Sequence, residues 1–217
     1  MALIRSAFQD ELDGVSQSLV DLTNMVSESI VKASKSLLSA DLNLAEEVIA
    51  TDVKIDDYQH ELETRIIDII ARQQPVASDL RALITALRMN ADLERMGDLA
   101  HHIAKVARLR HPNTAIPADL LLAFTEMGHV AEKLSTKVAT VITTRDTDMA
   151  LQVEKDDDEM DELHNKVIIG ITNGGDGITI ESAIDLTLLG RYYERFADHA
   201  VAVARRVYFL VKGEFPQ

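Results

Sequence analysis

The segments "LERMGDLA" (Leu93–Ala100) and "YERFADHA" (Tyr193–Ala200) repeat one pattern a hundred residues apart. Each holds Glu-Arg, then an apolar and a small residue, then Asp, so that two carboxylates stand four residues apart. That spacing places both acids on one face of an α-helix. Like charges so placed destabilise a helix by roughly 0.2–0.5 kcal/mol, so their recurrence in matched context indicates a function.

Outward from these segments, apolar residues recur at helical spacing over long stretches without proline. "RQQPVASD" (Arg72–Asp79) interrupts the first half, because Pro75 ends a helix and Ser78 or Asp79 can start another. The predicted helices of this half run from Leu3 to Leu38, from an N-cap at Asp41 or Asn43 to about Arg72, and from Ser78 or Asp79 to Leu109.

"RHPNTAIP" (Arg110–Pro117), with two prolines, is the best candidate for a domain boundary. Beyond it, helices are predicted over Ala118–Thr144, Thr147–Ile171 and Ile178–Val211, with "NGGDG" (Asn173–Gly177) as a flexible turn before the last.

The two halves align residue by residue. "ADLNLA" at Ala40 falls on "RDTDMA" at Arg145 with an offset of 105, which becomes 100 at the two opening segments. A loop tolerates this change of length within an internal duplication. The predicted fold is therefore all-α: two tandem three-helix bundles, residues 1–112 and 113–217.

Composition excludes several classes of protein. There are 36 acidic and 22 basic residues, a formal charge of −14, which disfavours nucleic-acid binding and favours cations or a basic partner. The absence of cysteine excludes disulfides, thiolate catalysis and cysteine-ligated metals. With neither a signal-peptide centre nor an apolar run of about 18 residues, we expect a soluble, cytoplasmic chain without membrane insertion.

The duplication also pairs the acids of the second helix in each half, at "DVKID" (Asp52–Asp56) and "DDEMD" (Asp157–Asp161). Two neighbouring helices would then present four carboxylates to one place, and a cation would relieve their repulsion. Oxygen ligands suit Mg, Mn, Ca or Fe, and a nearby histidine extends the choice to Zn or Ni. The candidate metal ligands are Glu94, Asp98, Glu194, Asp198, Asp52, Asp56, Asp157 and Asp161.

Two other interpretations of these acids stay open. They are ordinary solvated faces if Arg95 and Arg195 pair with them as surface salt bridges, which leaves a purely structural adaptor. His102 continues the Glu94/Asp98 stripe, either as an accessory ligand or as a surface or interhelix residue. The second half has no histidine there.

The alternative function is a carboxylate-bridged di-iron oxidoreductase or iron-storage bundle. His60 and His164, each three residues after an aspartate, faintly echo the Glu-x-x-His of such bundles. No nucleophile motif, phosphate-binding glycine loop or His-Glu-x-x-His is present.

"ADLERMGDLAHHIA" (Ala91–Ala104) and "GRYYERFADHAVAVARRV" (Gly190–Val207), with "RQQPVASDLR" and "DVKID", resemble the PhoU family over nearly the whole chain. The resemblance implies a metal-binding negative regulator of phosphate uptake and phosphate homeostasis, holding metal ions or clusters at the acid pairs. It also implies a dimeric adaptor in two-component signalling, and a regulator that is not an enzyme. Its partners would be a sensor histidine kinase and the ATPase subunit of the phosphate ABC transporter.

Overall fold

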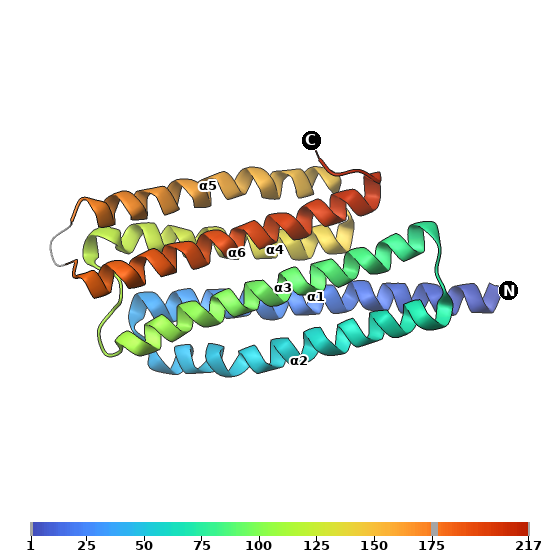
Figure 1. Cartoon of the computed structure of the whole chain (residues 1–217), viewed down its shortest axis with the longest axis horizontal. Coiled ribbons are helices and arrows are strands. Elements are labelled where there is room, and N and C mark those ends of the chain that lie inside the picture. The colour runs from blue at the N-terminus through green and yellow to red at the C-terminus, as the bar shows by residue number, and fades with distance from the viewer. Residues whose placement is uncertain (1, 175–177, 217) are drawn as a thin grey trace.

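The computed structural model describes residues 2–174 and 178–216, with side chains of the first helix from Phe8 onward. Within these ranges the chain forms six α-helices, one short 3-10 turn and no strand (Figure 1), which confirms the predicted all-α class and helix count. The elements are α1 (Ala2–Ser39), α2 (Leu42–Gln73), α3 (Ala77–Arg110), η1 (Ala118–Leu120), α4 (Leu121–Thr144), α5 (Thr147–Thr172) and α6 (Ile180–Lys212).

Matched acids cap the second helix of each half. The Asp41 carboxylate accepts a hydrogen bond from the Leu44 N–H at 3.1 Å, and Asp146 accepts from Asp148 and Met149 at 2.9 and 3.0 Å. An N-cap of this kind stabilises a helix by about 1 kcal/mol. The duplication therefore extends to the residues that start the helices.

Three helix starts differ from prediction. α3 begins at Ala77, before Ser78 and Asp79, and has no side-chain cap. The 3-10 turn η1 comes before α4, and α6 begins at Ile180 because the Thr179 hydroxyl accepts a bond from the Ser182 N–H. Of the turn predicted over Asn173–Gly177, residues 175–177 lie outside the described residues.

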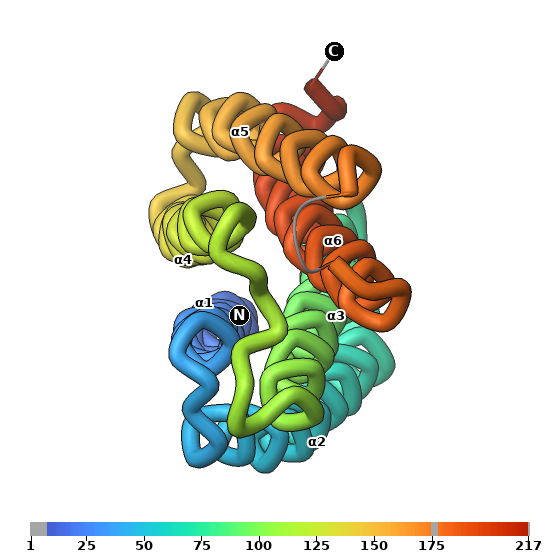
Figure 2. Tube along the Cα trace, turned by 90° about the vertical axis from the view of Figure 1, so that its left-hand side faces the viewer, coloured from blue at the N-terminus to red at the C-terminus, as the bar shows by residue number. Residues whose placement is uncertain are grey.

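The six helices form an elongated stack. α1 packs on α4 and α3 on α6, which joins the two halves, while α2 and α5 lie on opposite outer sides (Figures 1 and 2). α3 and α6 run antiparallel, since Asp92 pairs with Arg206 and Arg110 with Asp185. The third helices, which carry the two opening segments, are thus in contact along the centre of the molecule.

One apolar core runs through both halves. Fully buried side chains include Ile30 of α1, Phe124 of α4 and Phe196 of α6. The buried Tyr193 hydroxyl bonds to Ser34 Oγ at 2.8 Å, which ties α6 to α1. The two halves therefore share one core. The division into domains 1–112 and 113–217 stays a prediction.

None of the helices in the described ranges combines the length and the apolar character needed to cross a lipid bilayer.

Candidate metal centres

The first carboxylate cluster lies between α2 and α3. Ligand oxygens of Asp52, Asp56 and Asp98 all lie within 4.8 Å of one another. Gly97 permits this approach, because a Cβ atom there would meet Ile55 Cγ2 of α2 at 3.0 Å. The structure thus brings three of the four predicted acids of the first half together at one place, and Glu94 is not among them.

Burial and neighbouring negative charges raise the pKa of two acids of the first half, Glu94 and Asp56. The pKa of Glu94 is raised by burial and then by Asp98, with Asp56 and Asp52 adding to the effect. Burial likewise raises the pKa of Asp56, with help from Asp52 and Asp98. A bound cation would reverse this penalty, since it favours the charged form of each acid.

A histidine adds to this cluster. His101 Nδ1 lies in close contact with Asp52 Oδ2. The remaining ring nitrogen of His101 and the other oxygen of Asp52 are buried with no hydrogen-bond partner. Such atoms are costly unless something outside the chain satisfies them, and both are of a type that metal ions accept.

His102 of α3 points toward α6. Its ring stacks on Tyr192 of α6 with centroids 5.2 Å apart, so it is an interhelix residue. His101 was not predicted as a cluster residue. Its position three residues after Asp98 was the available signal, because an i, i+3 pair also shares a helix face.

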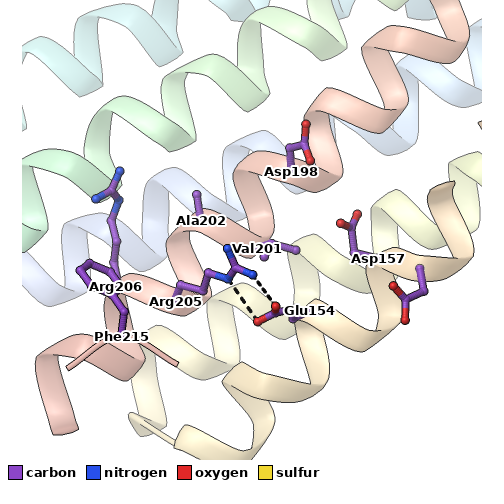
Figure 3. A pocket seen from close by; sticks show the side chains of 9 residues that line it. Glu154, Asp157, Asp198, Val201, Ala202, Arg205, Arg206 and Phe215 are labelled. Atoms are coloured by element: carbon purple, nitrogen blue, oxygen red, sulfur yellow. Dashed lines mark hydrogen bonds and ion pairs between the residues drawn. The ribbon is translucent and has the colours of Figure 1, made fainter. Parts of the chain in front are cut away.

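The second cluster lies between α5 and α6. Burial raises the pKa of Asp157 to about 7, together with the charges of Asp161, Asp198 and Glu194. Asp157 and Asp198 line a cavity of about 480 Å³, which the Arg205–Glu154 ion pair bounds on one side (Figure 3). Three predicted acids of the second half therefore raise the pKa of the fourth, but among the described residues only the first half brings ligand atoms of three acids within 4.8 Å of one another.

The two clusters take their histidine from different helices. Val201 stands where the first half has His101, but His164 of α5 lies against Gly190 and its charge lowers the pKa of Glu194. Overall, the pKa of Glu194 is raised, first by burial and then by the charge of Asp198. Glu194 Oε2 is buried without a hydrogen-bond partner. Each half thus offers four carboxylates and a nearby imidazole.

Exposure argues against a merely solvated face for some of these acids, whereas Asp56, Asp161 and Asp198 are exposed. The exposed fraction of the side chain is 12% for Asp52, 14% for Glu194 and 28% for Asp98. Arg95 does pair with Asp98, at 2.7 Å, whereas Arg195 has no ion pair among the described residues. The salt-bridge interpretation therefore accounts for part of the first cluster and leaves its buried atoms unexplained.

The residues present fit hard or borderline metal ions. Carboxylate oxygens dominate both clusters, an imidazole lies beside each, and three buried polar atoms in them lack partners: Asp52 Oδ1, His101 Nε2 and Glu194 Oε2. Ligation by the eight predicted acids itself remains a prediction.

Comparison with known proteins places the chain in a family. The model of the PhoU domain matches residues 19–107 and again residues 124–207. The chain is 41% identical to the phosphate-specific transport system accessory protein PhoU homolog 2 of Mycobacterium tuberculosis, across 98% of this chain and 100% of that one. It is also 41% identical to homolog 1 of Mycobacterium leprae, across 99% and 96%.

Two solved structures share the fold. The PhoU regulatory protein of Streptococcus pneumoniae superposes with a TM-score of 0.86 at 26% identity, covering 97% of this chain and 99% of that one. PhoU from Pseudomonas aeruginosa gives 0.87 at 27% identity, covering 95% and 100%. Since the family model matches both halves and identity to named members extends over nearly the whole length, the chain belongs to the PhoU family.

Proposed function

We propose that this protein is an accessory regulator of phosphate transport that acts without catalysis. The support is family membership and the names of its relatives, which are accessory proteins of the phosphate-specific transport system. In this proposal it is a cytoplasmic, dimeric adaptor. It contacts the ATPase subunit of the phosphate ABC transporter and a sensor histidine kinase, and it holds phosphate-starvation signalling off when phosphate is plentiful.

The proposal includes metal ions at both carboxylate clusters. The observation that carries this part is the set of buried, unpartnered atoms on Asp52, His101 and Glu194, close to acids whose charges raise the pKa of Glu94 and of Asp157. A cation would neutralise part of the −14 charge and join α2 to α3 and α5 to α6. Binding free energy of this kind adds to folding stability, so the adaptor's shape would depend on the metal.

Elemental analysis tests the metal sites. Wild-type protein purified without a metal-affinity tag is compared with the double variants Glu94→Gln/Asp98→Asn and Glu194→Gln/Asp198→Asn. We expect bound Fe, Zn, Mn, Ni, Mg or Ca in the wild type and a lower content in each variant. The control is Asp57→Asn/Glu61→Gln, an exposed acid pair with the same spacing on α2. Metal-free wild type after dialysis against these ions would remove the sites from the proposal.

Partner binding tests the adaptor role. The transporter ATPase subunit and the kinase are each titrated with metal-loaded and metal-stripped protein, and we expect weaker binding after stripping. Equal binding by the metal-loaded and the metal-stripped protein would show that the metal has no role in partner binding. Oxygen consumption during Fe(II) loading is measured in parallel, because catalytic turnover would favour the di-iron oxidoreductase instead.

A further inference from the structure

Arginines gather in a pocket where the two halves meet. Between α3 and α6 lies a cavity of about 350 Å³, bordered by the stacked rings of His102 and Tyr192. Its charged lining consists of three arginines and one carboxylate: Arg95, Arg191, Arg195 and Asp98. Arg95 and Arg195 occupy matched positions in the duplication, and the antiparallel crossing brings both to this pocket. Three guanidinium groups at one pocket are unexpected in a chain with a formal charge of −14.

Two of the three arginines are held by acids of the candidate metal centres. Arg95 bonds to Asp98 at 2.7 Å, and Arg191 bonds to Glu194 in close contact. Arg195 is exposed and makes no ion pair within the described ranges. As the structure stands, one guanidinium is therefore free to meet a ligand in the pocket.

Metal binding would change this balance. Asp98 and Glu194 are candidate ligands, and a carboxylate that binds a cation attracts a neighbouring guanidinium less strongly. The exposed fraction of the side chain is 62% for Arg95 and 53% for Arg191, so both can turn without disturbing the core. All three arginines would then be available to one ligand.

We propose that this pocket binds a phosphoryl oxyanion and that metal in the two carboxylate clusters strengthens the binding by releasing Arg95 and Arg191. The second half of this statement rests on the metal ligation proposed above. Guanidinium groups match phosphate oxygens with paired hydrogen bonds, and a doubly charged ion uses three such groups better than a single carboxylate does. The ligand is either free phosphate or a phosphate ester, which share this chemistry.

The position of the pocket gives the ligand a structural effect. Arg95 lies on α3 of the first half, whereas Arg191 and Arg195 lie on α6 of the second. A bound oxyanion would bridge the two halves at the contact that joins them, next to both clusters. Occupancy of the metal sites and of the pocket would then favour each other, since coupling between two sites is reciprocal.

Equilibrium dialysis with radiolabelled inorganic phosphate tests the proposal, with AMP titrated separately as the ester. The metal-loaded wild type is compared with the metal-stripped wild type, with Arg195→Gln, and with Arg95→Gln/Arg191→Gln. The matched control is Arg108→Gln, an exposed arginine of α3 outside the pocket. Metal content and helical circular dichroism are recorded for every sample.

We expect one phosphoryl ligand per chain, and about tenfold weaker binding after metal stripping or in either arginine variant, at unchanged metal content. Arg108→Gln should bind as the wild type does. If phosphate binds more tightly than AMP, the ligand of the pocket is the free ion; if AMP binds more tightly, the ligand is a phosphate ester.

Three results separate the two proposals. The oxyanion site is overturned if the metal-loaded wild type binds neither probe, or if the Arg195→Gln variant binds the probe as tightly as the wild type does. Neither result affects the proposed metal centres. Protein that takes up no metal overturns the metal centres. In that case phosphate binding lost in Arg195→Gln still supports the pocket, but without the coupling.

Discussion

At the residue scale, Asp157 shows most clearly how a cluster of carboxylates destabilises the ionised form of its members. Burial and three neighbouring acids raise its pKa to about 7, so near neutral pH the ionised form is disfavoured in the folded protein. The unfolded value is about 3.9. The stabilisation from its protonated form is complete below about pH 4 and is lost as the pH rises through 7.

The variant Asp157→Asn should therefore stabilise the metal-free protein at pH 8. We expect a gain of about 1–2 kcal/mol in the free energy of unfolding, after allowance for solvent screening of this half-exposed group, and little gain at pH 4. The same variant should gain less stability from added metal than the wild type does. Urea unfolding at both pH values measures this, with the exposed Glu162→Gln of α5 as control. Destabilisation at pH 8 would contradict the prediction.

At the scale of elements, one glycine sets the distance between α2 and α3. Gly97 lies on α3 between Glu94 and Asp98, facing Ile55 of α2, and a Cβ atom there would already be tight at 3.0 Å. The second half has Ala197 at the matched position, and α5 has the unbranched Met160 where α2 has Ile55. Methionine adapts to irregular gaps, so the second pair of helices tolerates the extra methyl.

The variant Gly97→Val should push α2 away from α3. We expect a loss of about 1–3 kcal/mol in the free energy of unfolding from overpacking. Metal content should fall at the first cluster and stay unchanged at the second. Thermal unfolding and elemental analysis measure the two effects. Ala91→Val, at an exposed position of α3, controls for the lower helix propensity of valine. Full metal content in Gly97→Val would show that the spacing of the helices does not set the site.

At the scale of the whole molecule, Asp92 fastens the two halves together. Its carboxylate meets His199 Nδ1 at 3.2 Å and Arg206 Nε at 2.7 Å, both on α6. Burial alone would raise the pKa of Asp92, but the hydrogen bonds from His199 and Arg206 outweigh it and hold the pKa below its ordinary value. The ionised form therefore stabilises the folded protein.

The variant Asp92→Asn should destabilise the protein at pH 7 by about 1–3 kcal/mol, because Arg206 is left beside a neutral partner. For a depressed pKa, the stabilisation is present above the unfolded value of about 4 and is lost as the pH falls through the folded value. The difference from the wild type should therefore shrink below pH 4. Chemical unfolding from pH 3 to 7 measures it, with the exposed Asp10→Asn as control. A difference that is constant with pH would contradict the ion-pair argument.

Much of the candidate site could be predicted because it depends on local spacing. The i, i+4 acids are on one helix face in any α-helix, and the matched offsets showed which helices correspond. The choice between His101 and His102 could not be made in this way. Both lie within a turn of Asp98 but point about 100° apart around the helix. Only the placement of α2 and α6 beside α3 brings His101 to Asp52 and His102 to Tyr192.

The sequence by itself determined the six helices, their duplication and the two sets of paired acids, because periodicity, proline breaks and capping residues act within a few residues of the chain. Only the tertiary structure decided that α3 and α6 meet. That contact creates the arginine pocket and the Asp92 ion pairs from residues about a hundred positions apart. The physical reason is that helix contacts depend on the shape of whole buried faces, which local spacing does not specify.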